Sequence, residues 1–196
     1  MAVRGNNGKN DPRIDRTRKL IEDAFLAVMD DKGFEDLSVN DVAERAGINR
    51  VTFYSHFTDK YALLEHSVRK MFGDELALKG LSEHSLDAES IRELFLTMCN
   101  YVEAIHEHCK PPHDHLDWII EAQISHVSAE LLSQWTERSG KSNGTQPTRL
   151  TAVAASSAMS GLVHQWLHTK KRVSSTAFVR VSLPIVLGVL GVQLES

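Results

Sequence analysis

The chain has 196 residues, 42% of them hydrophobic and 24% charged, and a formal net charge of −4. These fractions are ordinary for a folded globular protein, and the negative charge argues against indiscriminate nucleic-acid binding but not against a local DNA site. The longest apolar stretch, residues 183–194, is too short to span a bilayer. The first ten residues do not resemble a signal peptide, and two cysteines are too few for a disulfide framework. We therefore expect a cytoplasmic protein with no membrane partner.

Positive charge is concentrated at the start of the chain. Residues 1–19 carry six basic and two acidic side chains, a local charge of +4, so the remainder sums to −8. This asymmetry indicates that the N-terminal end of the chain approaches phosphate groups and that the rest of the chain does not. A solvated tail explains the first residues equally well, and we expect residues 1–10 to be flexible.

The apolar residues that follow repeat at helical spacing. Pro12 suits the first position of a helix, and Gly33 suits its end. Ser38 and Asp41 have the spacing of a capping box, with Asp in place of Glu, at the start of a short second helix. These signals predict two helices within the first 46 residues.

A tight turn then joins the second helix to a third. Ala43 is small enough to let the two helices cross closely, Gly47 suits a positive φ where the backbone leaves the second helix, and Ile48 is expected to lie beneath the turn. Asn49 can cap the third helix, which we expect at residues 50–57. Three short helices joined in this way form a helix-turn-helix.

Helical patterns also dominate the rest of the chain, where strand signals are scarce. A fourth helix is capped by Thr58 or Asp59. Longer helices are expected at residues 91–109, 116–137, 149–171 and 175–194. The sequence therefore predicts an all-α fold divided into a flexible basic tail (1–10), a helix-turn-helix domain (11–58), a linking helix (59–79) and a C-terminal helical domain (80–196).

The first third of the chain resembles the TetR (tetracycline-repressor-like) family of transcriptional regulators. The resemblance is carried by Gly33-Phe34, Leu37-Ser38-Val39, Val42-Ala43, Ala46-Gly47-Ile48, Thr52-Phe53-Tyr54, His56-Phe57 and Lys60. A recognition helix rich in aromatic residues, followed directly by a lysine at the fourth helix, is a specific signature. Val51 departs from the Gly or Ala that the family often has at that position. The remaining two thirds show only an all-helical pattern compatible with the family.

The resemblance implies a set of DNA contacts. Arg50 can reach guanine O6 and N7 or a phosphate, and Val51 could contact a thymine methyl group. Tyr54 and His56 are expected on the phosphate backbone, and Lys60 on a phosphate near the start of the fourth helix. The other candidates for base or phosphate contacts are Arg18, Ser38, Asn49 and Thr52. For each residue the alternative is a solvated side chain on a surface helix.

The last two helices indicate a homodimer. Residues 152–161 are nearly all small, which lets helices approach closely, and residues 178–194 are apolar on nearly every face. Burial within one chain is the alternative. Because a single recognition helix reads few base pairs, a two-fold dimer is expected to bind a pseudo-palindromic operator in double-stranded DNA.

The resemblance further implies a cavity for a small-molecule effector in the C-terminal domain, so that residues 80–196 serve both effector binding and dimerisation. An apolar cleft with a few polar groups is the expected form of such a site. The candidate lining residues are Phe95, Met98, Cys99, Val102, His106, Trp118, Ala122, His126, Leu162 and Trp166. Each of them can also be an ordinary core residue.

Four histidines and Cys109 lie within residues 106–115 and could supply zinc or copper ligands. However, Pro111-Pro112 interrupts their spacing, and a polar surface turn explains the stretch equally well. We assign no metal and no cofactor. The sequence also has no nucleophile elbow, phosphate-binding glycine loop or HExxH pair that would indicate an enzyme.

The sequence thus predicts a non-enzymatic, sequence-specific DNA-binding transcriptional regulator. By family default it is a repressor that a small molecule releases from its operator, as effector binding shifts the fourth helix and changes the spacing of the two recognition helices. The alternative is a dimeric helical sensor that acts through partner contacts and has lost specific DNA binding.

Overall fold

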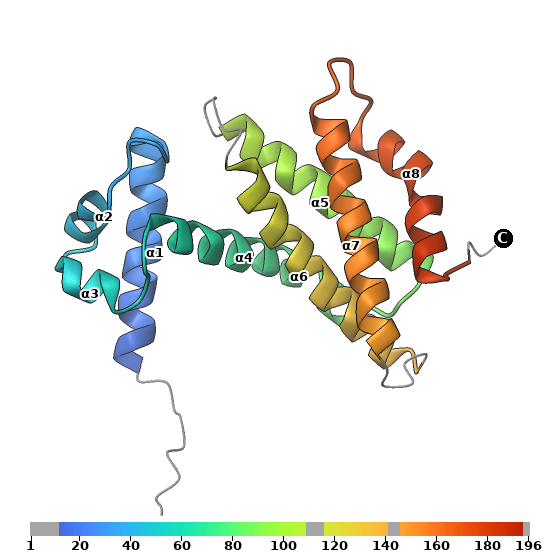
Figure 1. The fold of residues 1–196 in the computed structure, drawn as a ribbon, viewed down its shortest axis with the longest axis horizontal. Coiled ribbons are helices and arrows are strands. Elements are labelled where there is room, and N and C mark those ends of the chain that lie inside the picture. Colours follow the sequence, from blue (N-terminus) through green and yellow to red (C-terminus); the bar gives the residue numbers. More distant parts are fainter. Residues whose placement is uncertain (1–11, 109–115, 141–145, 194–196) are drawn as a thin grey trace, which may run out of the picture. The chain divides into compact units, whose positions relative to one another are not determined.

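In a computed structural model, which describes residues 12–108, 116–140 and 146–193, the chain forms eight α-helices and one 3₁₀ helix (Figure 1). No strand occurs among these residues, so the predicted all-α fold is confirmed. Contacts divide the chain into two compact units, Met1–Ser67 (unit 1) and Val68–Ser196 (unit 2). The boundary between the units falls inside one helix, α4 (Lys60–Leu78).

Unit 1 is built around an aromatic core. Its elements are α1 (Pro12–Lys32), α2 (Val39–Arg45), α3 (Arg50–Tyr54) and the first part of α4. Phe25 of α1 and Phe53 of α3 are fully buried. Phe34 meets Phe25 edge to face, with 6.3 Å between ring centroids, which is a favourable aromatic arrangement. The loop after α1 therefore packs back on that helix.

The starts and ends of the first helices follow from local capping chemistry. α1 begins at Pro12 and ends just before Gly33, and Ser38 and Asp41 form the reciprocal capping box of α2. Asp59 caps α4, because its Oδ1 accepts two backbone N–H groups of the first turn at 2.9 and 2.8 Å. These features confirm the predicted caps.

α3 ends at Tyr54, so the prediction of a helix over residues 50–57 is wrong for its last three residues. The amide of His56 bonds the carbonyl of Phe53, three residues back, at 2.9 Å, which tightens the last turn. Asp59 caps the next helix only a few residues later. α3 therefore ends early, and only a short turn separates it from the start of α4.

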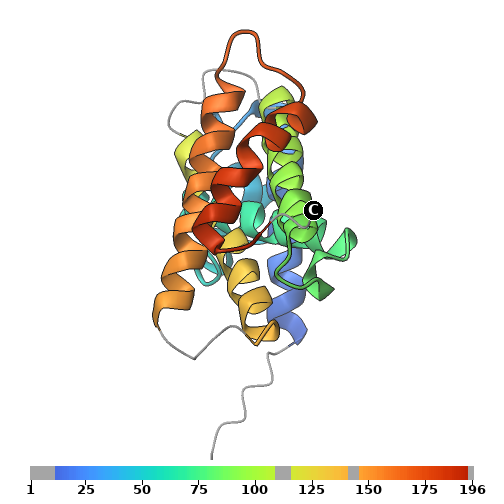
Figure 2. The same ribbon diagram turned by 90° about the vertical axis from the view of Figure 1, so that its right-hand side faces the viewer.

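Unit 2 is a bundle of longer helices, which are α5 (Ala88–His108), α6 (Asp117–Arg138), α7 (Gln146–Leu167) and α8 (Ser175–Leu190), preceded by the 3₁₀ helix η1 (Leu81–Glu83). α6 and α7 pack along each other, and α8 packs against both α5 and α7 (Figure 2). The fully buried Trp135 donates its indole N–H to the carbonyl of Leu81 at 3.0 Å and so ties η1 to α6. Within the described residues, no helix combines the length and the apolar character needed to cross a membrane.

The last two helices are shorter than predicted. α7 ends at Leu167 instead of residue 171, so Lys170 and Lys171 follow the helix instead of forming its last turn. Arg172 donates to the carbonyl of Leu167 at 3.3 Å and pairs with Glu103 at 2.5 Å. α8 ends at Leu190 because Gly191 takes a left-handed conformation, with φ of 64°.

Candidate DNA-binding site

The turn between α2 and α3 is a Schellman motif. The amide of Gly47 donates to the carbonyl of Glu44 at 3.1 Å, and the amide of Ile48 donates to the carbonyl of Ala43 at 3.0 Å. Gly47 has φ of 67°, as predicted, in a region that costs other L-residues free energy. Ile48 is half-buried. The motif fixes the direction in which α3 leaves α2.

α3 has one buried side and one exposed side. Phe53 is fully buried and lies beside Phe57, with 6.1 Å between ring centroids. The side chains of Arg50, Val51 and Tyr54 are exposed, and that of Val51 is 79% exposed. The buried phenylalanine thus holds a valine and a tyrosine in solvent, which gives α3 a surface suited to contact another molecule.

Arg50 and Tyr54 lie one helical turn apart and contact each other. Nη2 of Arg50 donates to the Tyr54 hydroxyl at 3.2 Å, and Cζ of Arg50 lies 5.7 Å from the centroid of the Tyr54 ring. A guanidinium has five N–H donors, so this contact leaves most of them available. Tyr54 therefore orients Arg50 on the exposed side of α3.

Asn49 caps α3, as predicted. Its Oδ1 accepts the backbone N–H of Thr52 at 2.8 Å and the Thr52 hydroxyl at 3.0 Å. The groups that remain for an outside partner are the NH₂ of Asn49 and the lone pairs of the Thr52 hydroxyl. Their predicted contacts with DNA stay predictions.

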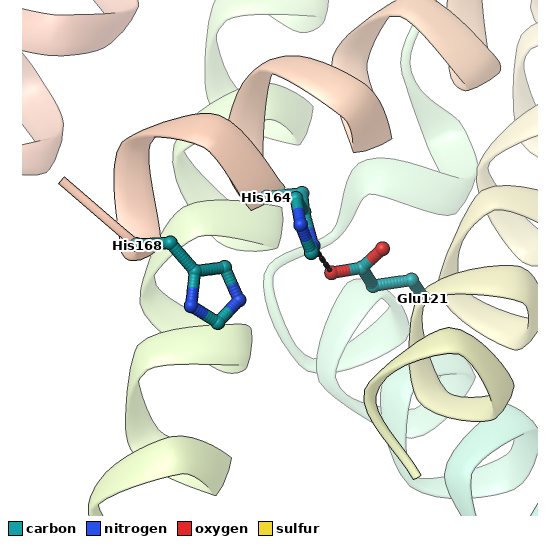
Figure 3. Close-up of side chains that lie close together, drawn as sticks. All are labelled: Glu121, His164 and His168. Atoms are coloured by element: carbon teal, nitrogen blue, oxygen red, sulfur yellow. Dashed lines mark hydrogen bonds and ion pairs between the residues drawn. The ribbon is translucent and has the colours of Figure 1, made fainter. Parts of the chain in front are cut away.

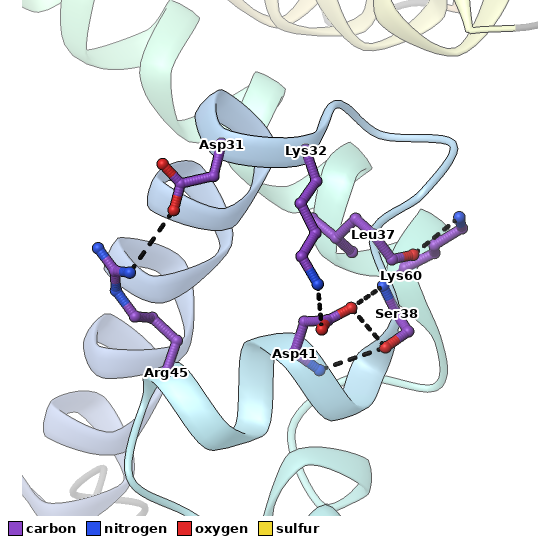
Figure 4. A network of polar contacts seen from close by, with 7 residues as sticks. All are labelled: Asp31, Lys32, Leu37, Ser38, Asp41, Arg45 and Lys60. Carbon is purple, nitrogen blue, oxygen red and sulfur yellow. Dashed lines mark hydrogen bonds and ion pairs between the residues drawn. The ribbon is translucent and has the colours of Figure 1, made fainter.

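The predicted phosphate contact Ser38 belongs to a polar network at the start of α2 (Figure 4). Its hydroxyl donates to Oδ2 of Asp41 at 2.7 Å and accepts the amide of Asp41 at 3.3 Å. Lys32 donates to the other carboxylate oxygen at 2.6 Å. Lys32, together with the hydroxyl and amide of Ser38, lowers the pKa of Asp41 to about 2. The sequence patterns did not reveal Lys32 as a member of this network.

Lys60 is also engaged within unit 1. Its ammonium donates to the carbonyls of Phe34, Glu35 and Leu37 at 2.9, 3.1 and 3.0 Å, and the last of these bonds is drawn in Figure 4. It also lies 4.7 Å from the centroid of the Phe34 ring. An ammonium has three N–H donors, and three carbonyls take them. This geometry gives the predicted phosphate contact of Lys60 no support and indicates that Lys60 holds the loop between α1 and α2.

The remaining DNA candidates, Arg18 and His56, do not belong to α3. Arg18, on α1, is half-buried, and its Cζ lies 5.7 Å from the centroid of the Phe57 ring. His56 is half-buried in the turn that follows α3. The structure therefore groups five of the predicted residues at α3, namely Asn49, Arg50, Val51, Thr52 and Tyr54.

Unit 2 contains a small cavity of about 30 Å³. Its lining residues come from α5, α6, the residue before α6 and the end of α7, and they are Val102, Ile105, His106, Leu116, Asp117, Ile120, Glu121 and Leu167. Of the predicted effector contacts, Val102 and His106 belong to this lining. Asp117 and Glu121, which add two carboxylates, were not predicted, although their spacing of four residues places them on one side of a helix.

The other predicted effector contacts do not line this cavity. Phe95, Met98 and Cys99 are buried in the core, where burial raises the pKa of the Cys99 thiol to about 12. Trp166 stacks on Phe178, with 5.6 Å between ring centroids. Trp118, Ala122 and His126 are exposed and Leu162 is half-buried. Of the histidine-rich stretch weighed as a source of metal ligands, residues 109–115 lie outside the described residues, as does the predicted tail, residues 1–10.

Residues 21–66 match the family model described as bacterial regulatory proteins, tetR family. The HTH-type transcriptional regulator BetI of Serratia proteamaculans (strain 568) is 33% identical over 73 residues, which cover 35% of this chain and 37% of that protein. The uncharacterized HTH-type transcriptional regulator YxbF of Bacillus subtilis (strain 168) is 29% identical over 114 residues, which cover 54% of this chain and 30% of that protein. The matched segments thus span about a third of the length of these relatives.

The fold is similar over nearly the whole chain to a solved structure of a repressor. The R. erythropolis transcriptional repressor QsdR, from the TetR family, superposes with a TM-score of 0.63 at 18% identity, and the match covers 95% of this chain and 98% of that one. The family match over residues 21–66 contains the whole of α2, the Schellman turn and α3. Residues 21–66 are thus similar to the tetR family of bacterial regulatory proteins, and the fold of the chain is similar to that of QsdR.

Proposed function

We propose that this protein is a sequence-specific, DNA-binding transcriptional regulator that reads base pairs with the exposed side of α3. The observation that carries the proposal is the set of exposed side chains on α3, in which Tyr54 orients Arg50 beside Val51. An arginine recognises guanine through its paired N–H donors, and a valine can contact the methyl group of thymine. The Schellman turn and the buried Phe53 support the proposal because they hold this surface rigidly on unit 1.

The regulator acts as a homodimer of two-fold symmetry. Val181 and Ile185 of α8 are 73% and 58% exposed, and Val189 extends the same side of the helix at the same spacing. α7, which packs against α8, adds the exposed Leu150 and Val153. Apolar side chains gathered on adjoining helices suit an interface with a second copy, which presents the same residues to the first.

Within this proposal the protein is a cytoplasmic repressor that a small-molecule effector releases from its operator. The cavity in unit 2 combines apolar walls with His106, Asp117 and Glu121, which is the usual composition of a ligand site. Its 30 Å³ has room for one or two water molecules, whereas organic ligands occupy sites of roughly 300–1,000 Å³. Effector binding therefore requires the lining side chains to move. The coupling is reciprocal, so operator DNA weakens effector binding by the same factor.

Selection of genomic DNA fragments by the purified protein, followed by footprinting, tests this function. We expect a protected pseudo-palindrome whose half-site centres lie about 34–36 Å apart, one helical turn, or a multiple of that spacing. Binding should weaken steeply with salt. Weak binding to all fragments alike would contradict the proposal and favour a dimeric sensor that acts through partner contacts.

Two variants provide the matched comparison. Val51→Asp places a negative charge on the exposed side of α3 and should abolish the enrichment. Leu78→Asp makes the same chemical change at a side chain that is 84% exposed in unit 2, and it should leave the enrichment intact. Equal enrichment by both variants would exclude α3 as the reading surface.

A further inference from the structure

The side chains of Glu121, His164 and His168 meet at the surface of unit 2 (Figure 3). Each offers a ligand atom, and these atoms lie within 4.8 Å of one another. Nδ1 of His164 lies 2.5 Å from Oε1 of Glu121, so the imidazole and the carboxylate already share a hydrogen bond. We propose that these three residues bind a divalent transition-metal ion of the zinc type.

The backbone places the two histidines correctly for this role. His164 is in the last turn of α7, and His168 follows it by one turn, with its amide bonded to the carbonyl of His164 at 3.2 Å. Two histidines four residues apart on one side of a helix can bind the same zinc ion. Their rings are 4.4 Å apart between centroids, which leaves each ring able to turn a nitrogen towards a shared ion.

Carboxylates from the neighbouring helix complete the set. Glu121 and Asp117 are one turn apart on α6, and Oδ2 of Asp117 lies 3.9 Å from Nε2 of His168. Two carboxylates and two neutral imidazoles carry a charge of about −2, which one divalent cation neutralises. Mixed nitrogen and oxygen ligands of this kind suit zinc and its neighbours in the first transition row.

Binding requires only small movements. Ligand atoms around a tetrahedral zinc ion are about 3.3 Å apart, given metal–ligand bonds of about 2.0–2.2 Å. His164 and Glu121 must therefore separate slightly as the ion takes the place of their hydrogen bond, and the proton of the neutral imidazole then sits on Nε2 so that Nδ1 can bind the metal. His164 and His168 are exposed and Glu121 is half-buried, so their side chains have room to adjust. Asp117 supplies a fourth ligand or, through a hydrogen bond, orients His168.

The site is distinct from the histidine-rich segment at residues 106–115. His106 is a neighbour of the site, since its ring lies 6.0 Å from that of His168, but the three ligands come from α6 and the end of α7. Glu121 and Asp117 also line the small cavity of unit 2. The proposed ion therefore lies beside that cavity.

Metal titration of the full-length protein, prepared without a histidine tag and stripped with chelator, tests the site. We expect one Zn²⁺ per chain by calorimetry, and we expect Co²⁺ to give the intense visible absorption of a four- or five-coordinate ion. His164→Ala and His168→Ala should each lower the affinity by at least about 100-fold, the upper end of the loss seen when a supporting residue of a metal site is removed. Glu121→Gln should lower it by at least about 10-fold.

Two controls make the result decisive. His126 forms a similar exposed pair with Glu130 at 3.0 Å, and His126→Ala should leave the affinity unchanged. The double variant His113→Ala/His115→Ala should also bind normally. The proposal is overturned if the wild-type protein binds no Zn²⁺, if His164→Ala and His168→Ala bind as tightly as the wild type, or if the affinity is lost only in the His113/His115 variant. Circular dichroism checks that each variant is folded.

Discussion

The carboxylate of Asp41 stabilises the start of α2 only while it is ionised. It accepts hydrogen bonds from Lys32 and from the hydroxyl and amide of Ser38, which together lower its pKa from 3.8 to about 2. Because the folded pKa lies below the unfolded one, this contribution to stability is present above about pH 4. It is lost as the pH falls towards 2.

Asp41→Asn tests this pH dependence. The variant should be less stable than the wild type at neutral pH, and the difference should shrink between pH 4 and pH 2 as Asp41 of the wild type becomes protonated. Hydrogen exchange measured on peptides from α1 and α2 follows the effect, and peptides from α6 serve as an internal control. A difference that stays constant over this pH range would contradict the account.

Lys60 stabilises the loop between α1 and α2, because its ammonium satisfies three carbonyls. Lys60→Ala should lower the stability of unit 1 by about 2 kcal/mol, the size of a hydrogen bond to a charged group. The salt dependence of DNA binding should keep its slope. A slope reduced by about one, with stability unchanged, would instead identify Lys60 as a phosphate contact.

These residues show how far local sequence reasoning extends. Ser38, Asn49 and Asp59 could be predicted as caps because their partners lie within three positions along the chain. The partners of Lys60 are carbonyls 23–26 residues earlier. No spacing rule predicts such contacts, because they depend on how the loop folds over the start of α4.

Among the structural elements, the Schellman turn sets the geometry of the helix-turn-helix, because it fixes the direction in which α3 leaves α2. Gly47→Ala should destabilise unit 1 by about 1–2 kcal/mol, because an alanine must adopt the left-handed conformation of Gly47, with φ of 67°. An added Cβ meets nothing within 4 Å at this position, so the cost comes from backbone strain alone. Thermal unfolding and hydrogen exchange measure the change.

Gly73→Ala is the matched control for this turn. Gly73 lies inside α4, and a Cβ there also meets nothing within 4 Å. Alanine favours a helix more than glycine does, by up to about 1 kcal/mol, so this variant should be neutral or stabilising. Destabilisation of similar size in both variants would contradict the role assigned to the conformation of Gly47.

The helices could be predicted from sequence more securely than their ends. Apolar spacing identifies a buried side but not the residue at which a helix stops. α3 and α7 both end before the predicted residue, because contacts with residues outside the helix replace further helical hydrogen bonds. At the end of α7, for example, Arg172 donates to the carbonyl of Leu167. The cavity was predicted only through Val102 and His106, because its lining depends on which sides of α5 and α6 face each other.

At the scale of the whole molecule, the exposed apolar side of α8 should hold two copies together. Ile185→Lys puts a charge in the middle of this surface, and we expect a monomer in analytical ultracentrifugation. Leu78→Lys changes an even more exposed apolar residue outside α7 and α8 and should leave the dimer intact. A dimer that persists in Ile185→Lys would place the interface elsewhere.

Function could be inferred from the sequence mainly through unit 1. The residues of α2, the turn and α3 are close together in the chain, so their pattern is visible without a structure. Unit 2 showed only helical periodicity. In the cluster of Glu121, His164 and His168, Glu121 and His164 are 43 residues apart in the chain. No sequence pattern predicts that α6 and α7 pack against each other.

A fluorescence anisotropy titration with Arg50→Ala, comparing the selected operator with a scrambled duplex of equal length, tests the central claim most directly. An arginine that pairs with a base contributes about 1–3 kcal/mol of discrimination, so the preference for the operator should fall roughly 10- to 100-fold. Lys70→Ala, which removes a charge paired with Asp74 at 3.0 Å in unit 2, should keep the full preference. An unchanged preference in Arg50→Ala would contradict the assignment of α3 as the surface that reads DNA.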